Sequence, residues 1–108
     1  MKKKNIKCFN KLVRDRIINI IENRGGKANY DILSDDEYLK ELNKKLIEEV
    51  NEFIEGNNTE EFADIFEVIY AIIENKKIKL NEIEDIRIKK KEERGGFENK
   101  IFLRNIVE

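Results

Sequence analysis

A short polar turn, Gly56-Asn57-Asn58, separates two long segments that both have the apolar spacing of helices. Each segment, residues 34–55 and residues 59–75, predicts a helix with one apolar face. Because only a few residues join them, we expect the two helices to lie antiparallel as a hairpin. The apolar positions are Leu39, Leu42, Leu46, Val50 and Phe53 before the turn, and Phe62, Ile65, Phe66, Ile69, Ile72 and Ile73 after it.

Both hairpin helices have recognisable start signals. Ser34 precedes Glu37 by three residues, and Asn58 precedes Glu61 by the same interval. This is the spacing of a capping box, in which the first side chain accepts a hydrogen bond from a backbone N–H that the helix leaves free. We therefore expect helices to begin directly after Ser34 and Asn58, the former being the longest in the chain.

Two further helices are expected outside the hairpin. The first runs from Asn10 to about Arg24 and ends at Gly25-Gly26, and the second runs from about Glu82 to Arg94 with Asn81 as its cap. The tail that follows, residues 97–108, is too apolar to be left in water. We expect it to pack on this subunit or on a neighbouring one.

The composition agrees with an all-α fold. Pro is absent, Gly occurs only 5 times and 42% of the residues are charged, a mixture that favours solvated helices over strands. A chain of 108 residues with 40% hydrophobic content can bury one modest core, which predicts a single domain over residues 1–108. A larger core, of the four-helix-bundle type, would need a partner and would be completed by oligomerisation.

The charge balance and the rare residue types exclude several functions. With 22 basic and 23 acidic residues, the formal net charge of -1 provides no general attraction for a nucleic acid polymer or a membrane. The opening, Met1–Lys4, is basic, but no apolar run of signal-peptide length follows it, so we expect a cytoplasmic protein. One cysteine, Cys8, and no histidine exclude an internal disulfide, a Cys/His zinc site and a Ser-His-Asp triad.

Four carboxylates are arranged as mirror images about the turn. Glu49 and Glu52 precede it, Glu61 and Asp64 follow it, and each pair is three residues apart and therefore shares a helix face. In a regular hairpin Glu49 lies opposite Asp64, and Glu52 lies opposite Glu61. The spacing thus predicts one acidic patch built by two helices.

Four like charges in one place repel one another, and burial beside apolar residues makes their ionisation costlier. Oxygen ligands without histidine or cysteine suit a hard cation, Mg²⁺ first and Mn²⁺ second. The alternative is that these are ordinary exposed glutamates, because short E-x-x-E and E-x-x-D matches are frequent on helices rich in Lys and Glu. Their mirrored placement on otherwise apolar segments favours the metal site.

At these residues the sequence resembles the all-α nucleoside triphosphate pyrophosphatase superfamily, which includes MazG, the dimeric dUTPases and the phosphoribosyl-ATP pyrophosphohydrolases. E-x-x-E followed by E-x-x-D on successive helices marks that superfamily. Two flanking segments, Asn10–Ile17 and Glu92–Phe97, resemble the phosphoribosyl-ATP pyrophosphohydrolase-like, house-cleaning subgroup. Together these segments describe most of the chain as one MazG-like domain.

The resemblance implies a function and assigns roles to the carboxylates. Glu49, Glu52, Glu61 and Asp64 would bind Mg²⁺, and Glu48 and Glu49 would be the catalytic residues, with Glu48 beside the ligands or acting as general base. The reaction would be hydrolysis of a nucleoside triphosphate, or of a nucleotide such as phosphoribosyl-ATP, between the α and β phosphates. The products would be a monophosphate and pyrophosphate.

Cationic side chains should neutralise the rest of the phosphate charge. Each candidate could instead form ion pairs on a solvated face, and no motif identifies the base or the sugar. The candidates for substrate binding are Lys11, Arg14, Arg16, Lys91 and Arg94, with Lys90 beside them.

Three hypotheses follow from the sequence. The first is the pyrophosphohydrolase, assembled as a homodimer or homotetramer. The second is a catalytically silent helical module that binds a nucleotide or a protein through the same acidic patch. The third is a purely structural bundle, whose thermal stability Mg²⁺ would leave unchanged.

Overall fold

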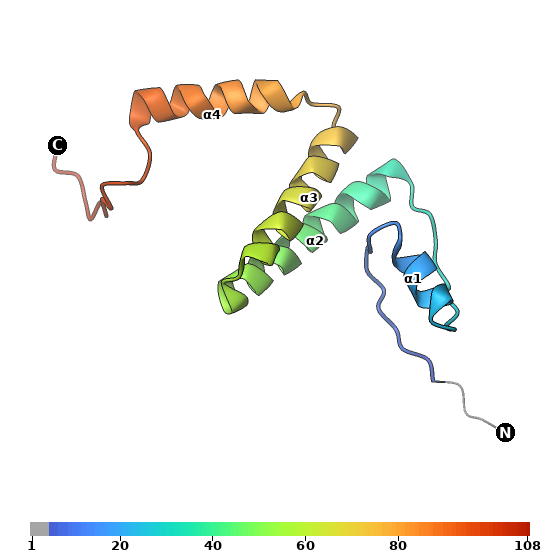
Figure 1. Ribbon diagram of the computed structural model, residues 1–108. Helices are drawn as coiled ribbons and strands as arrows, with labels where there is room; N and C mark the ends of the chain where they lie inside the picture. The colour runs from blue at the N-terminus through green and yellow to red at the C-terminus, as the bar shows by residue number, and fades with distance from the viewer. Residues whose placement is uncertain (1–4) are drawn as a thin grey trace. The chain divides into compact units, whose positions relative to one another are not determined.

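The computed structural model describes residues 5–108, so the basic opening at residues 1–4 lies outside it. The described residues form helices without any strand, which confirms the all-α class (Figure 1). Two compact units are present, one ending at Lys76 and the other running from Lys77 to Glu108. The prediction of a single domain stays a prediction. The helices are α1 (Ile17–Asn23), α2 (Asp35–Gly56), α3 (Thr59–Asn75) and α4 (Leu80–Arg94).

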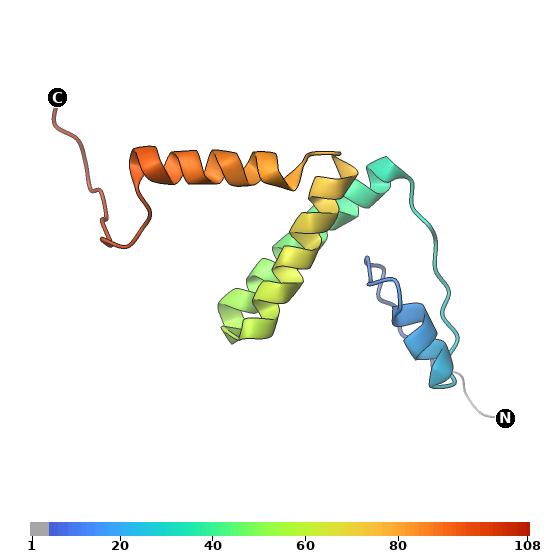
Figure 2. The ribbon, with the colours of Figure 1, turned by 45° about the horizontal axis from the view of Figure 1, so that its top comes forward.

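Helices α2 and α3 form the expected hairpin and lie side by side in both ribbon views (Figures 1 and 2). The Ser34 hydroxyl accepts a hydrogen bond from the Glu37 N–H at 3.3 Å, and Asn58 Oδ1 accepts one from the Glu61 N–H at 3.2 Å. Between the helices Asn57 adopts a left-handed conformation with φ of 52°, which reverses the chain. Both predicted starts are confirmed, and α2 is the longest helix of the described chain.

The hairpin has a thin apolar seam. Leu42 and Val68 are its buried apolar residues, and the rings of Phe53 and Phe62 lie 4.4 Å apart near the turn. Much of the apolar surface of α3 stays open, since Phe66 is 54% exposed in this chain. A core completed by further copies of the chain stays a prediction.

The predicted first helix is wrong in its start. Helix α1 begins at Ile17 and not at Asn10, whose φ of 46° is left-handed and does not continue into a helix. The residues between them are non-helical, and two of their cations, Lys11 and Arg14, form ion pairs with α2 and α3. The predicted stop is confirmed, because Gly25 has a φ of +88° that a glycine adopts without strain.

The second unit contains α4 and the tail. Helix α4 begins at Leu80, so Asn81 lies in its first turn and the predicted cap is wrong. The left-handed Lys77, with φ of 56°, turns the chain directly before this start, and the Glu82 N–H already bonds to the Lys79 carbonyl. The tail has no regular structure and its apolar side chains are exposed, Phe97 to 98%. Its packing on a neighbour stays a prediction.

Among the helices of residues 5–108, none combines the length and the hydropathy that a membrane crossing requires.

Candidate metal centre

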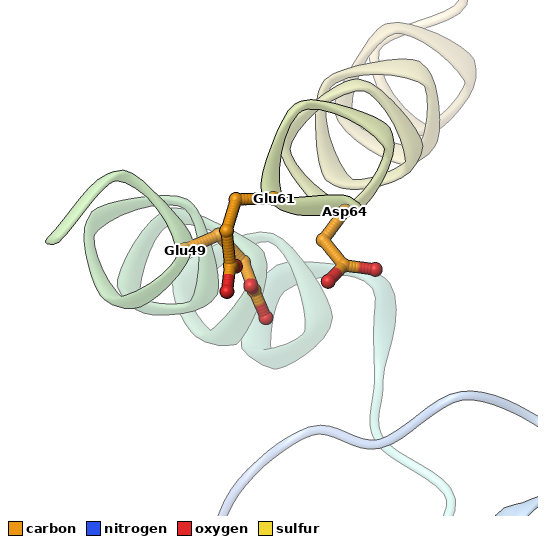
Figure 3. A group of neighbouring side chains, drawn as sticks. All are labelled: Glu49, Glu61 and Asp64. Carbon is orange, nitrogen blue, oxygen red and sulfur yellow. The ribbon is translucent and has the colours of Figure 1, made fainter. Parts of the chain in front are cut away.

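Three carboxylates from the two hairpin helices meet in one place. Glu49 comes from α2, while Glu61 and Asp64 come from the first turns of α3, and one oxygen of each lies within 4.8 Å of the other two (Figure 3). The Asn58 cap fixes where α3 begins. Glu61 and Asp64 then share one face of this helix because they are three residues apart. Oxygens around one Mg²⁺ lie at most about 4.2 Å apart, so a small closure would bring these three into range.

We call Glu49, Glu61 and Asp64 the acidic triad. Two of its oxygens are buried without a hydrogen-bond partner among the described residues. Glu49 is only 7% exposed. Its Oε2 atom and Oε2 of Glu61 accept no hydrogen bond from any residue that the structure describes. A buried carboxylate oxygen without a partner costs about 1–3 kcal/mol or more, and a bound cation removes that cost. The donor set therefore fits a divalent hard cation.

Burial and a neighbouring acid also disturb the protonation of Glu49. Its pKa is raised, first by burial and then by the carboxyl of Glu52, against the opposing influence of Lys45. Glu52 itself is exposed and lies outside the triad. The predicted patch of four carboxylates thus divides into three that converge and one that lies beside Glu49.

Three cations border the triad. Arg14 Nη2 is 2.8 Å from Asp64 Oδ1, and Lys11 Nζ is 2.9 Å from Glu48 Oε1. Lys45 Nζ lies 3.5 Å from that same Glu48 oxygen and 3.4 Å from Glu49 Oε1. The three cations, with Glu49 and Asp64, line a cavity of about 290 Å³. This cavity places positive side chains next to the carboxylates, as a site for a metal-bound anion requires.

Glu48 is held as an ionised group. The hydrogen bond from Lys11 lowers its pKa, and the charge of Lys45 acts in the same direction. Glu48 in turn raises the pKa of Lys11. A general base works best with a pKa near the operating pH. The assignment of Glu48 as a general base stays a prediction.

The other predicted substrate-binding residues are divided between the two compact units. Arg16 is exposed at the residue before α1, where its side chain makes no capping hydrogen bond. Lys91 and Arg94 are in the last turn of α4, where Lys91 Nζ lies 3.9 Å from Glu98 Oε1 and Arg94 borders a cavity of about 350 Å³ formed with the start of the tail.

Lys45 belongs to the site but is absent from the predicted set. Its side chain is only 19% exposed, and it bridges two carboxylates on the same helix. The sequence did contain a signal, because Lys45 precedes Glu48 by three residues and Glu49 by four, the intervals at which helical side chains pair.

Glu49→Gln is expected to stabilise the metal-free protein at neutral pH. A raised carboxyl pKa means that the folded state binds the proton more tightly than the unfolded state does. The wild type is therefore favoured below the ordinary carboxyl pKa and loses that advantage as the pH rises through the raised value. The glutamine never ionises and can donate a hydrogen bond to the neighbouring carboxylates. The variant should therefore melt above the wild type, by about 4–8 °C for each kcal/mol by which its free energy of unfolding is larger.

Thermal unfolding in EDTA at several pH values measures this difference. It should be largest near neutral pH and should shrink as the pH falls below the ordinary carboxyl range. A glutamine variant that is less stable than the wild type at neutral pH would show that the ionised Glu49 does not destabilise the metal-free fold.

Compared with protein-family models, with curated proteins and with solved structures, the chain matches none.

Proposed function

We propose that this chain is a Mg²⁺-dependent nucleotide pyrophosphohydrolase whose metal ligands include Glu49, Glu61 and Asp64. The observation that carries the proposal is the pair of buried Oε2 atoms on Glu49 and Glu61, which have no partner among the described residues. They lie in a carboxylate group whose oxygens are within 4.8 Å of one another. Carboxylates without nitrogen or sulfur ligands favour Mg²⁺, with Mn²⁺ as the alternative.

Glu52 stays in the proposed ligand set as a fourth carboxylate. It lies outside the triad, but it is close enough to Glu49 to raise the pKa of that group. A long exposed side chain can change rotamer at small cost, since its ordering entropy is of the order of 1 kcal/mol.

The charges that line the cavity support the proposed substrate class. Phosphate oxygens need positive partners, and Lys11, Arg14 and Lys45 line the cavity beside Glu49 and Asp64. When bound, Mg²⁺ would neutralise phosphate charge and lower the pKa of the attacking water. The lysines and the arginine would hold the phosphates in line for that attack, which is most of what such a reaction requires of a protein.

The position of cleavage is proposed from the resemblance to the superfamily. Water would attack the α phosphorus, and the bond from this atom to the α–β bridging oxygen would break. The bridging oxygen would leave with pyrophosphate, and the water would supply the new oxygen of the monophosphate. A house-cleaning role, toward altered nucleotides, is part of the same proposal.

A homodimer or homotetramer is proposed as the working form. The exposed ridge of α3, formed by Phe62, Phe66 and Tyr70, lies at positions four residues apart on one face of the helix. A second hairpin packed there would bury this ridge and make a four-helix core.

A nucleotide panel tests the proposed reaction. The purified chain is incubated with Mg²⁺ and with natural and altered nucleoside triphosphates and phosphoribosyl-ATP, and pyrophosphate and orthophosphate are measured separately. We expect pyrophosphate and a monophosphate from at least one of them, with the activity lost in EDTA. Binding without any product would support the silent module instead, and release of orthophosphate alone would contradict the α–β cleavage.

A further inference from the structure

A short segment before α1 is attached to both hairpin helices by its cations. We call residues 9–16 the strap. Lys11 of the strap pairs with Glu48 of α2, and Arg14 pairs with Asp64 of α3. The strap therefore spans the helices that carry the acidic triad, and one of its two attachments is on a triad member.

Arg14 is paired with a carboxylate that a metal ion at the triad would also use. Its Nη2 atom is 2.8 Å from Asp64 Oδ1, and the oxygens of Glu49 and Glu61 converge on the same carboxylate. A guanidinium and a divalent cation on one carboxylate repel each other, and this repulsion is strong at separations of about 4–5 Å. The ion pair and a metal at the triad therefore oppose each other.

We propose that Arg14 is a built-in competitor of the metal, which Mg²⁺ displaces from Asp64 and which then binds the phosphate chain of the substrate. This inference rests on the metal site of the proposed function. It adds that the resting ion pair weakens metal binding, and that a metal-bound polyphosphate removes the conflict by giving Arg14 another anion.

The exposure of the ion pair makes the exchange inexpensive. The side chains of Arg14 and Asp64 are 58% and 40% exposed, so water can solvate both groups when they separate. Exposed pairs of this kind change a competing equilibrium by about 2- to 5-fold. The metal needs only a modest advantage to displace the arginine.

The surroundings of Arg14 provide its second partner. Arg14, Lys11 and Lys45 line the same cavity as Glu49 and Asp64. A guanidinium binds phosphate oxygens through two parallel hydrogen bonds, which a lysine cannot reproduce. A polyphosphate held by a metal at the triad would therefore lie within reach of the displaced arginine, and the metal and the phosphate chain would strengthen each other's binding.

Calorimetric titration of the metal-free full chain tests the exchange, with Mg²⁺ alone and then with tripolyphosphate at saturating Mg²⁺. Arg14→Met should bind Mg²⁺ about 2- to 5-fold more tightly than the wild type, since the competitor is gone. It should bind tripolyphosphate about 10-fold more weakly or worse, since a charge-assisted hydrogen bond is lost. A purely structural ion pair would not move these two affinities in opposite directions.

Two matched variants complete the experiment. Arg24→Met removes the same charge from the C-terminal end of α1, where the arginine has no ion pair with a described residue, and should change neither affinity. Arg14→Lys keeps a cation near Asp64 but loses the two-pronged contact. It should bind Mg²⁺ like the wild type and tripolyphosphate more weakly.

The outcomes separate the two proposals. A wild type that binds no Mg²⁺ overturns the metal site and the exchange together. A wild type that binds Mg²⁺, with a folded Arg14→Met variant that binds it equally well or more weakly, leaves the metal site standing and overturns the exchange alone. Circular dichroism establishes that each variant is folded.

Discussion

Glu61→Gln is expected to slow the release of pyrophosphate by about 100-fold or more, because residues that only support metal ligands already change activity by about 10- to 100-fold. Glu61 contributes one of the two buried oxygens that have no partner in the described chain. Glutamine has nearly the same shape, so the helix start should form as before. It removes the charge and one oxygen, and its amide nitrogen cannot bind a metal. The loss should appear in the rate at saturating nucleotide as well as in metal affinity.

The neighbouring glutamate provides a matched control. Glu60 lies in the same first turn of α3, is exposed and stands outside the triad, so Glu60→Gln should retain the wild-type rate. Comparison with Glu52→Gln then decides whether the fourth carboxylate acts on the metal. Equal rates for the Glu60 and Glu61 variants, in preparations of equal thermal stability, would remove the triad from the proposed reaction.

The hairpin could be predicted from the sequence because local signals determine it. Asn57 adopts the left-handed conformation that asparagine tolerates, and the side chains of Ser34 and Asn58 accept hydrogen bonds only three residues away. The convergence of Glu49 and Asp64 then follows from helical geometry and from the short turn. None of these features depends on a distant part of the chain.

The features that were missed depend on contacts between distant residues. Before the late start of helix α1, Lys11 and Arg14 pair with residues 37 and 50 positions away, which no local pattern indicates. The exposure of Glu52 depends on how far one helix is rotated against the other. The spacing of a regular hairpin predicts which residues face each other across the turn, but it does not predict this rotation. The sequence therefore predicts one patch of four carboxylates, whereas three of them converge in the structure.

The packing of α2 against α3 also gives the proposed metal site its buried carboxylate. It buries Glu49 between the helices, where its pKa is raised, and leaves no described donor for the buried oxygens. An arrangement that only served stability would replace these groups with apolar residues, since buried charges seldom stabilise a fold. The buried carboxylates therefore lower the stability of the fold, and the proposed metal site gives a reason for their presence.

Mg²⁺ is expected to raise the melting temperature of the wild type, because a ligand that binds only the folded state stabilises it by mass action. At a concentration 100 times the dissociation constant the gain is about 2.7 kcal/mol, and each kcal/mol corresponds to about 4–8 °C in a domain near this size. The shift should therefore be of the order of 10 °C and should reverse on addition of EDTA.

Glu49→Gln should reverse the order of stability between the two conditions. In EDTA the glutamine variant is expected to melt above the wild type. It has no buried carboxyl at position 49, so it avoids the loss of stability that ionisation of Glu49, whose pKa is raised, causes at neutral pH. In saturating Mg²⁺ the wild type should melt above the variant, which has lost a ligand. Neither a structural bundle nor a nonspecific ionic effect produces this crossing. Without the ion, the buried carboxylates destabilise the fold, and a bound ion would remove that destabilisation. A wild type whose melting temperature is the same in Mg²⁺ and in EDTA would therefore exclude the metal centre.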